Sequence, residues 1–247
     1  MKRTEFLTRS FTSLLGIVAL SPLAEGCQTT AIVDPTAAPT TSGGSTNGSS
    51  ATNCALTPTE TEGPFPTKVP ANFVRTDIRA DRTGIALMLN LTIKNANASC
   101  AALAGAVVDV WHCDKDGYYS EYGGSGMQSV NYTNVSFLRG RQTTDAGGLT
   151  AFTTVFPGWY SGRAPHIHVH IYNAAGRSLL VTQIAFPFDI TNLVYTTGQA
   201  NGYTKGVQST KNEQDNVFSD GFATELATVS GSNAAGYVLT HTIVVSA

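Results

Sequence analysis

The chain has 247 residues, of which 42% are hydrophobic and 13% are charged, about half the charged fraction of an average soluble domain. Its 24 glycines and its scarcity of lysine and glutamate are typical of many strands joined by turns, so we expect an all-β fold. A formal net charge of −2 gives no long-range field that would attract nucleic acid or an anionic membrane surface, and we expect no nucleic-acid partner.

The first residues have the pattern of an export signal. Lys2, Arg3 and Arg9 precede an apolar stretch at 14–20, and small residues follow, so residues 1–27 are predicted to direct export. Cys27 directly follows "LAEG", which leaves two alternatives, an exported lipoprotein or an exported protein without a lipid. We expect a periplasmic, cell-surface or secreted location, with membrane contact only through a lipid at Cys27.

Residues 28–53 are rich in Ser, Thr, Gly and Pro. They contain no aromatic residue and a single charged one, Asp34, so they bury too little surface to order themselves and are predicted to form a flexible tether. Residues 54–247 then form one domain of ordinary size.

Export permits disulfides, and Cys54, Cys100 and Cys113 remain once Cys27 is assigned to the anchor. If residues 106–113 form one strand, Cys100 and Cys113 tend toward its opposite ends. Cys54 is then expected to pair with one of them, and the third can stay free and buried. The sequence leaves the choice open.

Alternating hydrophobic residues predict six strands, joined by turns rich in Gly or Asn. They are 85–93, 105–113, 149–156, 166–172, 179–186 and 237–245. A single short helix is expected, near 215–226. This pattern is typical of a β-sandwich of mainly antiparallel strands with long loops.

The fourth of these strands, "HIHVHIY", places three histidines on one face and three apolar residues on the other. Imidazoles at i and i+2 lie on the same side of a strand, so two of them can share one metal ion. The alternative is an ordinary polar row that faces solvent. The histidines are His166, His168 and His170, and the apolar residues are Ile167, Val169 and Ile171.

Two tyrosine loops come close to this strand in the sequence. A Pro-Gly turn at 157–158 places Tyr160 at a sheet end just before His166, where its phenol can reach the same metal. The turn "DKDG" presents Tyr118 and Tyr119, and because neighbours in an extended chain face opposite ways, at most one of them points at a given site. The alternative is that these tyrosines are structural.

Taken in order, five segments of the chain resemble the intradiol ring-cleavage dioxygenases, the family of protocatechuate 3,4-dioxygenase and catechol 1,2-dioxygenase, and most of all its exported branch. Each segment alone is a weak signal, but the ordered set is specific and covers about residues 54–247. The segments are "TEGPF" (61–65), "DVWHCDKDGYYS" (109–120), "FLRGRQTTDAGG" (137–148), "PGWYSGRAPHIHVHI" (157–171) and "VTQIAF" (181–186).

The resemblance implies a β-sandwich that holds a non-haem ferric ion. The ligands that match the family pattern are Tyr119, Tyr160, His166 and His168. The implied reaction cleaves the bond between the two hydroxylated carbons of a catecholic substrate with O2, and gives a muconate-type dicarboxylic acid. His170 lies outside the pattern and is expected to be a strand-face residue, and His112 and His241 are expected to be non-ligands.

The resemblance also implies roles for residues around the ion. Tyr160 is the ligand that substrate displaces and that carries a proton away. Arg163 matches the arginine that stabilises negative charge on the substrate, and Gln183 matches a glutamine near the reacting carbon. Gly63 and Pro64 match residues that line the mouth of the substrate site.

The chain departs from the family pattern in two respects. "SGRAP" (161–165) is shorter than its counterpart in the intracellular enzymes, so we expect a more open pocket and bulky or linked phenolics as plausible substrates. The helical segment that forms the dimer of catechol 1,2-dioxygenases has no counterpart, and the oligomeric state stays open. Two other functions are considered: an exported β-sandwich with a copper or zinc site on the H-x-H pair, and a binding module without catalysis.

Overall fold

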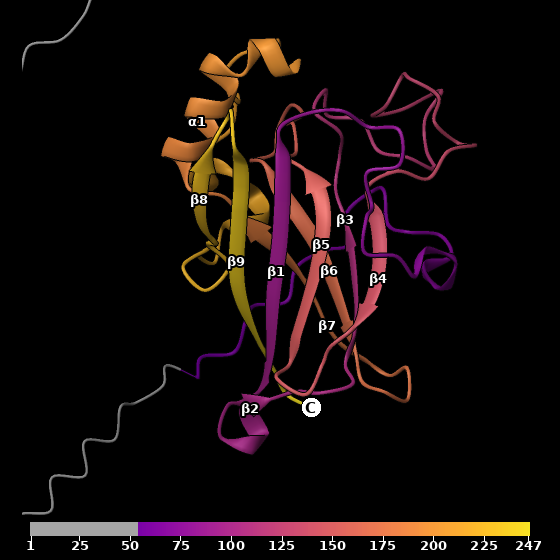
Figure 1. Cartoon of the computed structure of the whole chain (residues 1–247), viewed down its shortest axis with the longest axis vertical. Coiled ribbons are helices and arrows are strands. Elements are labelled where there is room, and N and C mark those ends of the chain that lie inside the picture. The colour runs from indigo at the N-terminus through magenta and orange to yellow at the C-terminus, as the bar shows by residue number, and fades with distance from the viewer. Residues whose placement is uncertain (1–53) are drawn as a thin grey trace, which may run out of the picture. The chain divides into compact units, whose positions relative to one another are not determined.

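The computed structural model describes residues 54–247, which form two packed β-sheets (Figure 1). The predicted export signal (1–27), Cys27 and the predicted tether (28–53) lie outside the described residues. Within the described part, no helix has the length and apolar character needed to cross a membrane.

One sheet has five strands in the order β2-β1-β9-β8, with β5 also paired to β1. Strands β1 and β9 run parallel, and every other pair in this sheet is antiparallel. The strands are β1 (Ala86–Asn95), β2 (Ala101–Ala102), β5 (Leu149–Val155), β8 (Thr228–Ser232) and β9 (Gly236–Val245).

The second sheet has four antiparallel strands in the order β4-β3-β6-β7. They are β3 (Val107–Trp111), β4 (Arg139–Thr143), β6 (His166–Tyr172) and β7 (Ser178–Ala185). The central strand β6 pairs with β3 on one side and with β7 on the other, so Trp111 and Gln183 both lie opposite His168.

The core lies between the two sheets and is filled by the apolar face of each strand. In β1 every second residue is buried, as alternation predicts for a strand with one face on a core. In β6 the apolar residues Ile167, Val169 and Ile171 are fully buried in the same core. The predicted all-β sandwich is therefore confirmed.

All six predicted strands are present, but the predicted helix is wrong. Residues 215–226 contain only a 3-10 turn, Asn216–Phe218, because the Asp215 side chain accepts from the backbone N–H of Val217 and Gly221 has a left-handed φ of 105°. The α-helix is α1 (Phe188–Thr197), which lies next to the β8–β9 hairpin through a hydrogen bond from Asn233 to Thr197 (Figure 1). Further 3-10 turns are Pro70–Phe73, Ala96–Ala98, Gln199–Asn201 and Asn212–Gln214.

Cys54 and Cys100 form a disulfide, with their Cα atoms 5.8 Å apart. Among the described residues, Cys113 is the free cysteine; it is buried and its thiol lies 3.5 Å from the carbonyl oxygen of Gly158. Burial raises the pKa of this thiol far above its usual value, so it stays neutral. The pairing that the sequence left open is thus between Cys54 and Cys100.

Glu225 is a fully buried carboxyl group at the edge of β7. Thr182 donates a hydrogen bond to its Oε1, while its Oε2 has no hydrogen-bond partner among the described residues. Burial, followed by the charge of Glu60, raises the pKa of Glu225 from 4.5 to about 8. The folded protein therefore binds a proton at this residue in a pH range where the unfolded chain does not.

The first prediction concerns the pH dependence of stability. Because the pKa of Glu225 is higher in the folded state, its contribution to the free energy of unfolding falls as pH rises from about 4.5 to about 8. Glu225→Gln removes this contribution, so the variant should gain stability relative to the unsubstituted protein as pH rises, and be the more stable of the two at pH 9. Thermal unfolding of both proteins between pH 5 and pH 9 tests this, and a pH-independent difference would contradict it.

Candidate metal centre

The four predicted metal ligands come together at one end of the β4-β3-β6-β7 sheet. His166 and His168 lie on β6, Tyr119 lies in the loop that follows β3, and Tyr160 lies in the loop between β5 and β6. The alternation of β6 directs both imidazoles away from the apolar core. His170 continues the same face but is turned to other partners, as described below.

The polar atoms of these four side chains converge. His166 Nε2 lies 3.4 Å from Tyr119 Oη, 3.4 Å from Tyr160 Oη and 3.1 Å from His168 Nε2. No group of three or more His, Cys, Asp or Glu side chains that could hold a metal occurs in residues 54–247. A metal ion at this centre would therefore depend on the two tyrosine oxygens as well as on the two imidazoles.

A hydrogen bond leaves Nε2 of His166 ready to accept a cation, and stacking holds the His168 ring beside it. His166 Nδ1 donates to the carbonyl oxygen of Ala164 at 2.6 Å, so the lone pair of a neutral His166 ring is on Nε2, at the centre of the cluster. His168 stacks on the Trp111 indole, with ring centroids 4.8 Å apart, and its Nδ1 has no partner among the described residues. Both rings are buried, and their Nε2 atoms face each other.

The pKa values indicate that the four candidate ligands are neutral when no cation is bound. Burial raises the pKa of Tyr119 well above 10 and that of Tyr160 to about 12. Burial also lowers the pKa of His166 and of His168 well below 6.5. Phenolate and imidazole suit a hard, highly charged cation, and binding such an ion removes the phenol protons, so the donor set fits the Fe(III) that the resemblance implies.

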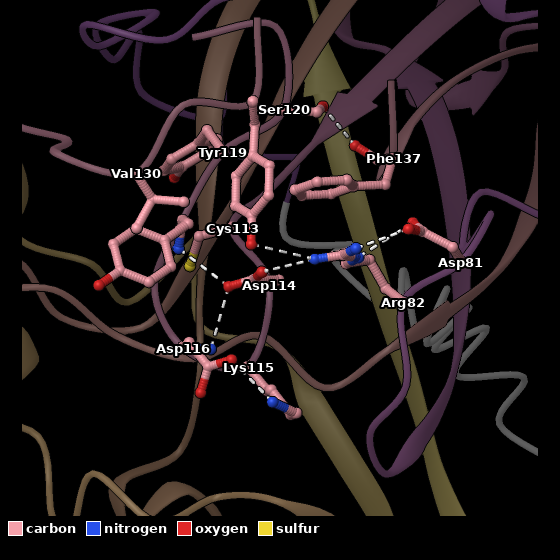
Figure 2. Close-up of polar contacts among 12 residues, drawn as sticks. Asp81, Arg82, Cys113, Asp114, Lys115, Asp116, Tyr119, Ser120, Val130 and Phe137 are labelled. Carbon is pink, nitrogen blue, oxygen red and sulfur yellow. Dashed lines mark hydrogen bonds and ion pairs between the residues drawn. The ribbon is translucent and has the colours of Figure 1, made fainter. Parts of the chain in front are cut away.

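Tyr119 is held by the tight turn that precedes it. The Asp114 carboxylate accepts from the backbone N–H groups of Asp116 and Tyr118, both at 3.0 Å. Figure 2 shows the Arg82 guanidinium between the carboxylates of Asp81 and Asp114, which fixes this turn to the segment before β1. Of the two neighbouring tyrosines, the turn directs Tyr119 toward the centre. Tyr118 packs edge-on against Tyr132, away from the centre.

Two polar side chains hold the backbone at Tyr119. Gln128 accepts from the Tyr119 N–H at 2.7 Å and donates to its carbonyl oxygen at 2.8 Å. The buried Arg139 guanidinium donates to the hydroxyl and carbonyl oxygens of Ser120 and pairs with Glu121. The Tyr119 ring itself stacks on Phe65, with centroids 4.9 Å apart.

Arg163 and Gln183 lie beside the centre and contact each other. Arg163 Nη2 donates to Gln183 Oε1 at 2.5 Å, and Gln183 Nε2 donates to the carbonyl oxygen of Thr61 at 2.8 Å. The charge of Arg163 contributes to lowering the pKa of both His166 and His168. The structure thus brings these two predicted residues to the ligand cluster.

Gly63 lies directly over His168. Its φ of 68° is in the left-handed region, and a Cβ atom on this residue would lie 3.1 Å from His168 Cε1. Pro64 follows it and is exposed. The segment that contains both predicted mouth residues therefore covers one side of the centre, and only glycine fits at position 63 without a shift of the imidazole.

The other histidines and arginines of the motifs lie outside the cluster. His170 stacks on Tyr172 and contacts Glu62 and Ser178. His112 contacts the carbonyl oxygen of Cys113 and the hydroxyl group of Thr154. His241 lies on β9, in the other sheet. Arg141 forms a bidentate pair with Asp109 and Arg139 pairs with Glu121, so both have structural partners.

Sequence reasoning missed three residues that shape the centre: Phe65, Gln128 and Asp215. Phe65 lies inside the quoted "TEGPF" segment, so its aromatic ring next to the mouth residues was a usable signal. Gln128 and Asp215 act through contacts with Tyr119 and Arg163 that no spacing in the sequence indicates.

The fold and the centre define an all-β domain whose candidate metal ligands are two tyrosines and two histidines. A family model described as Dioxygenase matches residues 66–200, more than half of the chain. The chain therefore belongs to the intradiol ring-cleavage dioxygenase family.

Among solved structures, an intradiol ring-cleavage dioxygenase from Tetranychus urticae superposes with a TM-score of 0.68 at 29% identity, over 78% of this chain and 95% of that one. Chlorocatechol 1,2-dioxygenase of Rhodococcus opacus is 28% identical over 45% of this chain and 48% of its own length. Catechol 1,2-dioxygenase of Acinetobacter baylyi is 27% identical over 57% of this chain and 50% of its own length. The chain thus spans about half the length of these two relatives.

The second prediction concerns Gly63→Ala. The added Cβ should displace the His168 ring and weaken iron binding and turnover at least about tenfold, since small shifts of positioned groups cost that much or more. Iron retained after dialysis and oxygen uptake measure the effect.

Gly176→Ala is the matched control, because Gly176 has a φ of 82° in the β6–β7 turn and a Cβ there would meet nothing within 4 Å. Both variants should lose about 1–2 kcal/mol of stability from the left-handed backbone. If Gly63→Ala keeps iron and turnover as well as Gly176→Ala does, the proposed role of Gly63 is wrong.

Proposed function

We propose that this chain is an exported non-haem Fe(III) intradiol dioxygenase, which uses O2 to cleave the bond between the two hydroxylated carbons of a catechol and gives a muconate-type dicarboxylic acid. The observation that carries the proposal is the convergence of three groups on His166 Nε2: the phenol oxygens of Tyr119 and Tyr160, and the Nε2 atom of His168. Family membership and the likeness to an intradiol enzyme of Tetranychus urticae support it.

A ferric ion held by Tyr119, Tyr160, His166 and His168 would supply a Lewis acid that makes a catechol ring reactive toward O2. The protein side chains have separate roles in binding the ion and in accepting the substrate proton. Tyr119 is fully buried and stacked on Phe65, so it is the phenolate that stays in place. Tyr160 is partly exposed and lies in the loop between β5 and β6, so its phenol oxygen is the one that would accept a proton from the incoming catechol.

Arg163 and Gln183 act on the substrate. The guanidinium is a permanent cation close to the ligands, where it stabilises negative charge that develops on the substrate. Gln183 holds Arg163 and also anchors the carbonyl oxygen of Thr61, next to the Gly63 segment over His168. Gly63 and Pro64 form the mouth on this side.

The short loop 161–165 supports an open substrate site. Ser161 and Gly162 are exposed, and a Cβ on Gly162 would meet nothing within 4 Å. We propose that bulky or linked catecholic phenolics reach the centre through this side, since both residues are exposed and Gly162 carries no side chain.

Export is supported by the Cys54–Cys100 disulfide, because disulfides persist in oxidising compartments and are rare in the cytosol. The export signal at 1–27 and the tether at 28–53 make a periplasmic, cell-surface or secreted enzyme, with a lipid at Cys27 as one form of attachment. The catalytic domain of this proposal is residues 54–247.

The third prediction concerns the purified protein and two ligand variants. The protein should be red-brown from tyrosinate-to-ferric charge transfer, contain iron, and consume oxygen with at least one of catechol, protocatechuate and hydroxyquinol. Tyr160→Phe and His168→Ala should each lose most turnover, and His168→Ala should also lose iron, because each removes a ligand.

Tyr118→Phe and His170→Ala are the controls, since these neighbours of the ligands point to other partners and should keep turnover and colour. A protein that holds zinc or copper instead of iron and lacks the red-brown colour would support a metal site on the histidine pair alone. A colourless protein without metal would support a binding module. Full oxygen uptake by Tyr160→Phe or His168→Ala would reject the assignment of ligands.

A further inference from the structure

Two of the three nitrogens of the Arg163 guanidinium have hydrogen-bond partners, and the third has none among the described residues. Its Nε donates to both carboxylate oxygens of Asp215 at 2.9 Å, and its Nη2 donates to Gln183 at 2.5 Å. A guanidinium has five N–H groups, and the two on Nη1 make no hydrogen bond with a described residue. Nη1 is therefore the nitrogen of Arg163 that has both of its N–H groups available to a substrate.

Asp215 is itself fixed by the backbone. Its side chain is fully buried, and it also accepts from the Ala164 N–H at 2.8 Å and from the Val217 N–H at 3.0 Å. The carbonyl oxygen of the same Ala164 accepts from the Nδ1 of His166. One carboxylate thus fixes both the guanidinium and the backbone to which a proposed metal ligand is hydrogen-bonded.

The Asp215 carboxylate is also the counter-ion of the Arg163 guanidinium. A guanidinium that is largely buried beside a metal centre is repelled by the metal cation and needs a counter-ion, since an unpaired buried charge is costly. Glu60 also lies within electrostatic range of Arg163, but burial raises the pKa of Glu60 to about 7 and it forms no ion pair with Arg163. Asp215 is the carboxylate in contact.

We propose that Asp215 is the positioning residue for Arg163: it neutralises the guanidinium and fixes its orientation, so that Nη1 is ready to donate to negative charge on the substrate. This inference rests on the proposed dioxygenase function. Asp215 does not touch the reacting atoms and acts through Arg163. Without the carboxylate, the guanidinium keeps Gln183 as its one hydrogen-bond partner and loses its fixed orientation.

The test, and our fourth prediction, compares Asp215→Asn with Asp109→Asn. Asp109 is also a buried carboxylate that pairs with an arginine. It lies on β3, and its bidentate partner Arg141 lies outside the centre. Both variants should lose comparable stability, and both should keep iron and colour. Only Asp215→Asn should lower kcat, by about 10²-fold, the usual loss when a donor to developing charge is misplaced, with a much smaller change in KM.

Two further readouts separate positioning from a general structural role. In an Arg163→Ala background, Asp215→Asn should cause no further loss of kcat, because its effect passes through the arginine. Peptide mass spectrometry after treatment with phenylglyoxal should show faster modification of Arg163 in Asp215→Asn than in the unsubstituted protein or Asp109→Asn. This second readout needs no turnover.

The outcomes distinguish the two proposals. If the unsubstituted protein binds no iron and turns over no catechol, the proposed function fails. If it is active but Asp215→Asn keeps kcat within about twofold, leaves Arg163 no more reactive, loses its iron, or adds to the loss in Arg163→Ala, the inference about Asp215 fails while the function stands.

Discussion

The burial of one face of β6 is the interaction on which the rest of the centre depends. Ile167, Val169 and Ile171 are fully buried between the sheets, so the strand cannot rotate or slide without exposing them. A slip of one residue would exchange the two faces and place Ile167 and Val169 where His166 and His168 now lie. The geometry of the imidazole pair is therefore a direct result of core packing.

The tyrosines are held in a different way, since both lie in loops. Tyr119 relies on buried polar side chains, in particular Gln128 and Arg139, which satisfy the backbone around it. Such a network stabilises one loop conformation only when all its members are paired. Tyr160 has fewer constraints and is partly exposed, and this difference between the two phenols matches the different tasks that the proposed reaction gives them.

Local periodicity was enough to predict the main strands, because alternation between a core face and a polar face is a property of neighbouring residues. It did not predict the helix α1, or that Asp215 would use its side chain to hold Arg163 instead of starting a helix. The sequence also does not predict that Cys54 pairs with Cys100, because this pairing depends on where two distant segments meet. The ligand set came from motif spacing and family resemblance, whereas Asp215 and Gln128 act through tertiary contacts alone.

The disulfide has a mechanical consequence for the enzyme. Cys54 is bonded to Cys100, which comes just before the short strand β2, and the chain after Cys54 continues through Thr57, bound to β9, to the segment over His168. A pull on the chain ahead of Cys54 is therefore carried through the sulfur bridge into the sandwich. The residues proposed to form the mouth do not carry that force, and their geometry is insulated from tension in the chain before Cys54.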